Sequence, residues 1–155
     1  MITIDELMTS DPYSLRESDT LDNARNVMTE KHIRHIPITD SDNRLQGLIT
    51  QRDVLEATDP KSQQQDIKLA DIMIKNVSVI HQSDSVRQAA IHLQTHKYGC
   101  LPVVTDGIVI GIITDSDFID IAINLLEQVE MAEDVADIET DTLDDVELPV
   151  AEDLL

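Results

Sequence analysis

The apolar and polar positions of this chain follow one order of elements, and that order occurs twice. A short extended run comes first, followed by a helix that Ser18 or Ser83 would cap, because each begins a Ser-Asp pair ahead of apolar residues at helical spacing. Two apolar runs joined by a polar turn then predict a hairpin, and a second helix ends the unit. The predicted extents are 13–15 and 77–80 for the extended runs, 35–39 with 45–50 and 100–105 with 108–114 for the hairpins, and second helices that begin at Gln51 and Asp115.

The two copies share residues as well as a pattern. At an offset of 65 residues Met8 meets Met73 and Pro37 meets Pro102. After the turn at 40–43 the offset becomes 64, and "GLITQRD" from position 47 meets "GIITDSD" from position 111. The single slip falls in a turn, where changes of length are tolerated. The chain therefore contains a duplicated unit of βαββα order.

Proline stands inside the first strand of both predicted hairpins. Because proline has no N–H to donate to a neighbouring strand, Pro37 and Pro102 indicate an edge strand, or one whose open side meets something other than a regular strand.

This combination of a Ser-Asp helix, a Leu/Ile-Pro strand and Gly-apolar-Ile-Thr-x-x-Asp resembles the cystathionine-β-synthase (CBS) domain, tandem pairs of which form a Bateman module. The resemblance covers about residues 5–57 and 70–124. It implies an α+β fold of two pseudo-symmetric βαββα repeats packed sheet to sheet, dimerisation into a flat disc, and clefts between the repeats that bind adenine-containing ligands. The expected divisions are a first repeat at 1–58, a linker at 59–69, a second repeat at 70–126, and an acidic helical extension and tail at 127–155.

The repeated Thr-x-x-Asp permits two interpretations. Thr at a helix N-cap with Asp three residues later is a capping-box variant, and capping is the favoured role for one such motif taken alone. A carboxylate at a helix N-terminus can also accept two hydrogen bonds from a ribose diol. With the resemblance considered, we expect ribose binding at Asp117 and leave the two roles open at Asp53.

The resemblance also implies that Thr and Asp of one repeat face strand backbone and basic side chains of the other. A stronger nucleotide site would comprise Thr114, Asp117, Tyr13, Ser14, Ile33, Arg34, His35, Ile36 and Arg52. A weaker site would comprise Thr50, Asp53, Ser78, Val79, Tyr98, Gly99 and Cys100, with Leu101 and Ser116 nearby. Two Arg and a His belong to the stronger site, whereas the only base expected near the weaker site is Arg52, so we expect phosphate to favour the stronger one.

Charge narrows the range of partners. The formal net charge is −20, and no Lys or Arg follows Lys97. Such a chain repels nucleic acid and anionic membrane, and an aromatic content of 2% offers no base-stacking platform. No run approaches the ~18 apolar residues of a membrane span. The single cysteine and the absence of a signal-like N-terminus favour the cytoplasm.

Two further groups of residues favour structural roles. His92 and His96 have the i, i+4 spacing of metal ligands, but no third ligand is evident, so packing or a subunit contact is favoured and no metal site is assigned. Cys100 precedes Leu-Pro in an apolar strand, which favours a small buried side chain over a reactive thiol. No catalytic motif is present, and we expect no enzymatic activity.

The acidic C-terminal segment lies outside the family pattern. We expect the helix that begins at Asp115 to continue to about residue 134 and the chain to be disordered beyond it. Scattered apolar residues after position 134 would allow partial docking onto the module or its dimer mate, or capture of a partner as a peptide.

The function that best fits these features is a non-catalytic regulatory module. It would sense AMP, ADP or ATP, with S-adenosylmethionine or NAD as other possible ligands, and relay its state as a homodimer to an unknown regulated protein. One alternative is an interaction adapter that acts through the acidic tail. Another is a divalent-cation sensor that uses the carboxylates.

Overall fold

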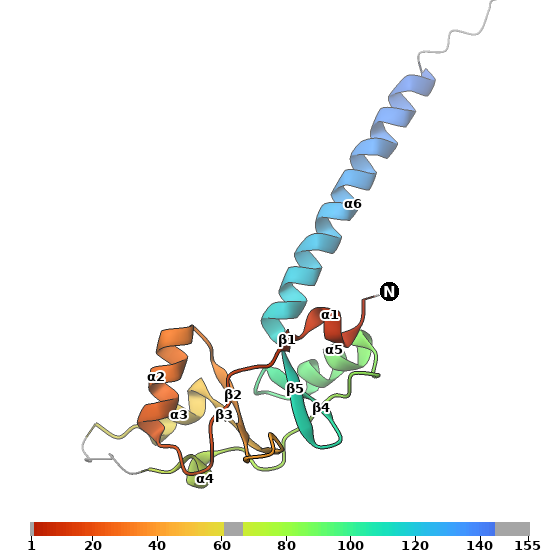
Figure 1. Cartoon of the computed structure of the whole chain (residues 1–155). Helices are drawn as coiled ribbons and strands as arrows, with labels where there is room; N and C mark the ends of the chain where they lie inside the picture. The colour runs from red at the N-terminus through yellow and green to blue at the C-terminus, as the bar shows by residue number, and fades with distance from the viewer. Residues whose placement is uncertain (1, 61–66, 145–155) are drawn as a thin grey trace, which may run out of the picture. The chain divides into compact units, whose positions relative to one another are not determined.

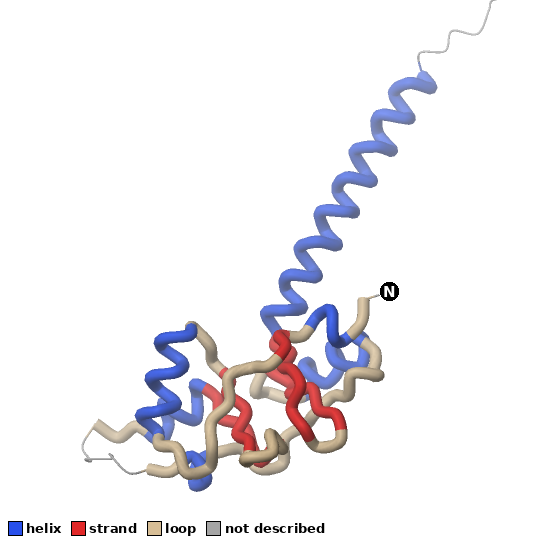
Figure 2. The backbone as a smooth tube through the Cα atoms, in the orientation of Figure 1, coloured by secondary structure: helices blue, strands red, loops and turns tan. Residues whose placement is uncertain are grey.

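A computed structural model describes residues 2–60 and 67–144, with side chains up to residue 138. The chain forms two compact units, residues 1–117 and 118–155, and each is described by itself. The first unit contains the first repeat and the second repeat as far as Asp117 (Figures 1 and 2). Its elements are α1 (Ile4–Leu7), β1 (Thr9–Ser10), α2 (Leu21–Lys31), β2 (His35–Thr39), β3 (Leu45–Thr50), α3 (Gln51–Ala57), α4 (Leu69–Ile72), α5 (Val86–Thr95), β4 (Cys100–Thr105) and β5 (Ile108–Thr114), and α6 (Asp115–Asp144) begins at its end.

The two hairpins are confirmed with the predicted bounds. β2 pairs antiparallel with β3, and β4 pairs antiparallel with β5. Each ladder has a register shift at the same place, between Ile38 and Thr39 in the first and between Val103 and Val104 in the second. The duplication seen in sequence is thus reproduced down to the local irregularity.

The predicted helix caps were wrong by two residues. Thr20 and Ser85, not Ser18 and Ser83, cap α2 and α5, and each forms a capping box with the residue three positions on. The acidic residue of each Ser-Asp pair closes the preceding turn instead: Asp19 accepts from the Arg16 N–H at 2.7 Å. A carboxylate beside a tight turn competes for local N–H groups, so the helix starts after the turn.

The predicted extended runs are each reduced to a single bridge on the open side of a hairpin. Leu15 donates its N–H to the Pro37 carbonyl at 3.1 Å, and Ile80 donates to the Pro102 carbonyl at 3.0 Å. The nitrogen of a strand residue lies on the same side as its carbonyl, so both prolines turn their donor-less nitrogen away from the hairpin partner. The edge position inferred from these prolines is therefore confirmed.

The two repeats exchange their N-terminal segments. β1, from the start of the chain, pairs with β5 of the second repeat, at Thr9–Ile112 and Ser10–Gly111. In the first repeat, Leu48 on β3 exchanges two hydrogen bonds with Ile74, of 3.0 and 2.8 Å. Each sheet is therefore completed by residues from the start of the other repeat.

Two methionine–glycine pairs fix this exchange. A Cβ added at Gly47 would lie 2.6 Å from the Met73 sulfur and 2.8 Å from the Ile74 carbonyl oxygen. A Cβ added at Gly111 would collide with the Met8 sulfur in the same way. The repeated glycines are thus explained by close approach of the exchanged segment, since any side chain would occupy the methionine's place.

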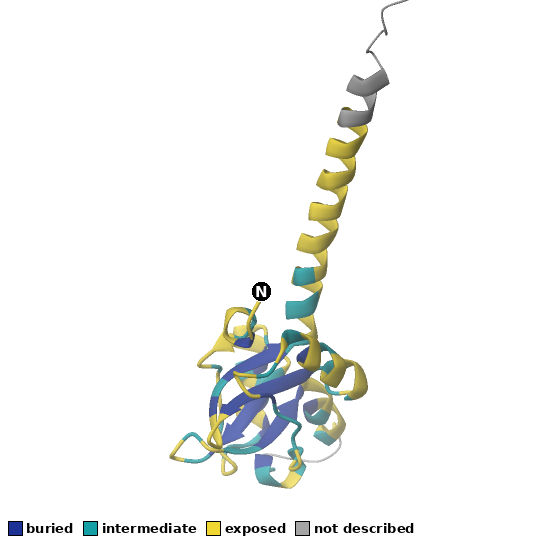
Figure 3. Cartoon of the chain, turned by 90° about the vertical axis from the view of Figure 1, so that its right-hand side faces the viewer, coloured by how far each residue is buried: buried dark blue, intermediate teal, exposed yellow. Residues whose placement is uncertain are grey.

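The core is aliphatic and continues into the exchanged segments. Leu69, which the sequence analysis placed at the end of the linker, is fully buried among Leu21, Met28 and Ile49 of the first repeat. Leu48, Cys100 and Ile112 form a smaller buried cluster where the sheets meet. Buried residues lie mainly on the strands (Figure 3).

The helix that starts the C-terminal extension was predicted too short. α6 continues to Asp144, ten residues beyond the expected end, so residues 135–144 are helical rather than disordered. The rest of the predicted tail, 145–155, lies outside the described residues. None of the helices that the structure describes is long and apolar enough to cross a membrane.

Substitution of either close-packed glycine should destabilise the protein. We expect Gly47→Ala and Gly111→Ala each to lower the free energy of unfolding by about 1–3 kcal/mol, because the backbone carbonyl beside each Cβ cannot rotate away. Urea unfolding followed by circular dichroism measures the loss. Wild-type stability in both variants would contradict the tight approach of the exchanged segments.

Candidate functional site

Both Thr-x-x-Asp motifs form helix caps. At the start of α3 the Thr50 N–H and hydroxyl each donate to Oδ2 of Asp53 at 2.8 Å, and the Asp53 N–H donates to the Thr50 hydroxyl oxygen at 3.2 Å. At the start of α6 the Thr114 N–H donates to Oδ2 of Asp117 at 2.8 Å. In both caps these hydrogen bonds are accepted by Oδ2. The capping role is therefore present in both copies.

A first cleft lies beside Thr114 and measures 320 Å³. Five residues of the predicted stronger site line it: Tyr13, Ile33, Arg34, His35 and Thr114. Four others do not, namely Ser14, Ile36, Arg52 and Asp117. Thr9, Pro12, His32, Ile112 and Ser116 complete the lining. Thr9 and Pro12 were not foreseen because the exchange of the N-terminal segment places them here.

A second cleft of 530 Å³ lies beside Thr50. Four residues of the predicted weaker site line it: Thr50, Asp53, Tyr98 and Gly99. Ser78, Val79, Cys100 and Leu101 do not, and Ser116 lines the first cleft instead. The remaining lining residues are Arg34, His35, Gln51, Arg52, Leu55, Ile74, Lys97 and Asp115.

The expected contrast in basic side chains between the clefts was wrong. Arg34, Arg52 and Lys97 all line the second cleft, where only Arg52 had been expected. Two carboxylates, Asp53 and Asp115, line it as well. The first cleft has fewer bases but no carboxylate in its lining. Basic side chains alone therefore do not rank the two clefts.

Arg34 and His35 line both clefts and form a wall between them. The wall is tied to the second repeat by two contacts. His35 Nε2 lies 2.6 Å from the Tyr98 carbonyl oxygen, and a guanidinium nitrogen of Arg34 lies 3.9 Å from a carboxylate oxygen of Asp115. Anything bound in either cleft would therefore meet the same two side chains.

The surroundings of His35 favour its neutral form. Burial lowers its pKa, and the positive charge of Arg34 acts in the same direction, while the Tyr98 carbonyl and the carboxylates of Asp115 and Asp53 oppose the shift. Because a carbonyl oxygen only accepts, the proton of neutral His35 lies on Nε2. The other ring nitrogen, Nδ1, is then an acceptor.

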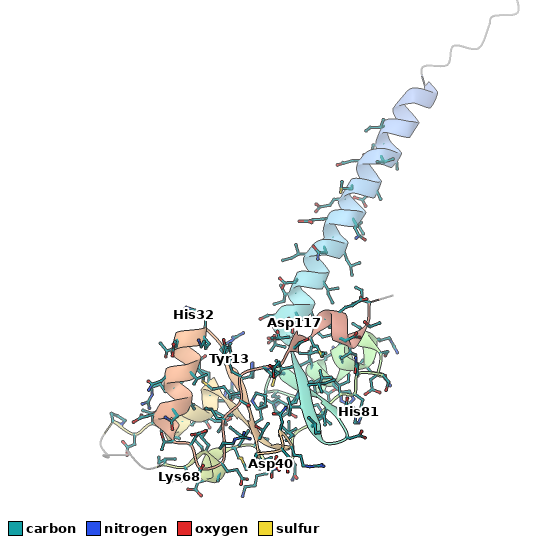
Figure 4. All side chains as sticks on the ribbon, viewed as in Figure 1. Tyr13, His32, Asp40, Lys68, His81 and Asp117 are labelled. Carbon is teal, nitrogen blue, oxygen red and sulfur yellow. The ribbon has the colours of Figure 1, made fainter. Side chains whose placement is uncertain are left out.

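Tyr13 lines the first cleft and is 54% exposed. The Lys31 ammonium lies 5.2 Å from the centre of this ring, within cation–π range. Figure 4 shows Tyr13 close to His32 near the end of α2, and Asp117 at the start of α6. An exposed aromatic ring beside a cleft offers a flat surface to a purine base.

The histidines of α5 belong to a packed cluster. The rings of His92 and His96 stack 5.9 Å apart, and His96 stacks on Tyr98. Ser78 ties the cluster together, because its N–H donates to the Tyr98 hydroxyl and its own hydroxyl lies 3.0 Å from His96 Nε2. This geometry supports the packing role expected for the histidines. Within the described part of the chain no three metal-ligating side chains gather.

Cys100 is fully buried between the sheets, as the sequence indicated. Burial raises the pKa of its thiol to about 12, and the negative charge of Asp115 adds to the effect. A thiol with such a pKa is almost entirely protonated at neutral pH, so it is a poor nucleophile.

A model of the CBS domain matches residues 4–59 and 69–124. The chain belongs to the CBS-domain family. The two matched segments coincide with the two repeats, so the tandem organisation and the α+β fold inferred from the duplicated motif are confirmed.

Solved structures of CBS-pair proteins are similar along most of the chain. A protein from Vibrio cholerae provisionally named acetoin utilization protein AcuB is 41% identical, with a TM-score of 0.74, over 84% of this chain and 97% of that one. The CBS domain pair of protein MJ0100, solved with 5′-methylthioadenosine and S-adenosyl-L-methionine, is 25% identical, with a TM-score of 0.70, over 78% of this chain and 95% of that one.

Curated relatives include larger enzymes. Homoserine O-acetyltransferase of Methanococcus vannielii is 34% identical over 112 residues, which are 72% of this chain but 23% of the enzyme. This CBS pair thus spans about a quarter of the length of the acetyltransferases that it matches.

The buried thiol should be inert in the folded protein. At pH 8 we expect Cys100 to react with an aromatic disulfide reagent at least a hundredfold more slowly in native protein than in urea, since burial blocks access and the raised pKa of about 12 lowers the thiolate fraction. Absorbance of the released thiolate measures both rates. Equal rates would show that the strand carrying Cys100 opens readily.

Proposed function

We propose that this CBS pair is a regulatory module that binds an adenosine phosphate in the clefts between its repeats. One observation carries the proposal. Each cleft joins the Thr of a Thr-x-x-Asp cap in one repeat to residues of the other, and Arg34 lines both. The adenosine ligands of the MJ0100 pair, 25% identical to this chain, support the same ligand class.

The carboxylates of the two caps would hold the ribose. In the Asp53 cap, Oδ2 takes the N–H and hydroxyl of Thr50, so a diol can approach Oδ1 while the cap stays intact. In the first cleft, Asp117 would reach the ribose from just outside the lining, next to Thr114 and Ser116, which do line the cleft. The capping role and the ribose role are compatible at the same residue.

The basic side chains favour a phosphorylated ligand. Arginine offers paired N–H groups that match phosphate oxygens, which AMP, ADP and ATP carry close to the ribose. The first cleft remains the proposed stronger site, now because no carboxylate lines it, whereas Asp53 and Asp115 oppose the phosphate in the second. S-adenosylmethionine has no phosphate for these groups to bind, and the pyrophosphate of NAD carries less negative charge than that of ADP.

The relay of the bound state to a regulated protein belongs to this proposal, as does a homodimer. A ligand that contacts both repeats stabilises whichever relative arrangement it binds better, and only that difference in affinity can be passed on. The adapter alternative draws on the exposed apolar side chains of α6. The divalent-cation alternative has no cluster of ligands among the described residues to favour it.

A thermal-shift panel tests the ligand class. With AMP, ADP, ATP, S-adenosylmethionine and NAD, we expect an adenosine phosphate at a hundredfold excess over its Kd to add about 2.7 kcal/mol to the stability of the folded protein. Asp117→Asn should weaken that binding about ten- to a hundredfold, because it removes the charge from the ribose acceptor.

Asp84→Asn is the matched control. Asp84 closes a turn by accepting the His81 N–H at 2.9 Å, and it lines neither cleft. Comparing the variants without nucleotide separates loss of a cap from loss of a ligand contact. If no nucleotide stabilises the wild type, the sensor proposal fails and the caps are purely structural.

Because Arg34 and His35 line both clefts, we expect two nucleotides to bind with unequal affinity. One Arg34 guanidinium cannot serve phosphates in both clefts, so the second nucleotide should bind about tenfold or more weakly than the first in isothermal titration. Arg34→Gln should weaken the first binding event and leave the second nearly unchanged. Arg44→Gln, on the hairpin turn outside both clefts, is the control. An Arg34→Gln variant that loses affinity equally in both events would rule out competition for this side chain.

A further inference from the structure

α6 carries an apolar seam that the nucleotide proposal does not use. Between residues 118 and 136 apolar residues recur at alternating steps of four and three, which is the spacing that places them along one line of a helix in a coiled coil. The seam residues are Phe118, Ala122, Leu125, Val129, Ala132 and Ala136.

The residues that flank the seam are almost all uncharged. On one side lie Ile119, Leu126 and Glu133, and on the other lie Ile121, Gln128 and Val135. The acidic residues Asp120, Glu127 and Asp134 repeat every seven positions on the opposite face. The negative charge of this helix is thus concentrated away from its apolar face.

The apolar face is open to solvent. Leu125 and Val129 of the seam are 53% and 55% exposed, and the flanking Leu126 is 61% exposed. A helix owes most of its stability in water to packing of its apolar face, so a face of this length needs a cover. Figure 3 shows exposed residues along the described length of α6 beyond its first turns.

We propose that this face binds α6 of a second copy of the chain. The flanking positions of a coiled coil select its partner, and a helix built for a basic partner would place its acids there. Here five of the six flanking residues are uncharged, so two identical acidic helices can meet with their carboxylates pointing outward. Isoleucine and leucine beside the seam widen the surface that each helix would bury.

Cysteine cross-linking in the full-length protein tests the contact. The native Cys100 is buried, with a pKa raised to about 12, so a cysteine introduced on α6 is the reactive thiol. If the two helices are parallel, we expect Val129→Cys, on the seam, to give disulfide-linked dimers under mild oxidation. Glu127→Cys, on the outer face of the same turn, is the matched control and should give few.

Three further samples define the helix direction. In a parallel pair, Ala122→Cys and Ala136→Cys also cross-link to themselves. In an antiparallel pair centred near residue 127, a mixture of Leu125→Cys with Val129→Cys cross-links instead, while the single seam variants do not. Either pattern supports the proposal. Cross-linking of every seam sample only at the level of Glu127→Cys overturns it. These outcomes do not depend on nucleotide.

Discussion

The reciprocal exchange of N-terminal segments is the constraint on which the rest of the first unit depends. In each repeat, the second strand of the hairpin has a free edge. The first residues of the other repeat form hydrogen bonds with that edge. Thr9 and Ser10 pair with β5, and Ile74 pairs with β3. The exchange buries Leu69 in a core made by the other repeat's residues, so the repeats form one folding unit rather than two adjacent domains.

The clefts follow from this arrangement. Because the exchange holds the two hairpins face to face, the loop before β2 meets the loop before β4, and His35 reaches the Tyr98 carbonyl. The same contact separates the open space into two adjoining parts, each beside one Thr-x-x-Asp cap. Two pseudo-equivalent sites are therefore not independent copies, since Arg34 from the first repeat lines both.

Local features of the fold could be predicted from the sequence, and features set by distant residues could not. Strand bounds follow from apolar runs and turns, and the duplication supports each assignment twice. The caps were misplaced because Asp19 uses its carboxylate in the preceding turn, a choice that propensity does not reveal. Thr9 lines the first cleft and Arg34 the second because segments far apart in sequence pair with one another. A single sequence carries no signal for such pairing.

The exchange has a consequence for how the protein is made on the ribosome. When residues 1–58 have emerged, β3 has no Ile74 beside it and the first core has no Leu69, so the first repeat cannot complete itself until the second has begun. The N-terminal segment waits still longer, because its partner β5 lies about a hundred residues downstream. The exchange thus imposes an order of folding in which the first residues to leave the ribosome are among the last to pack.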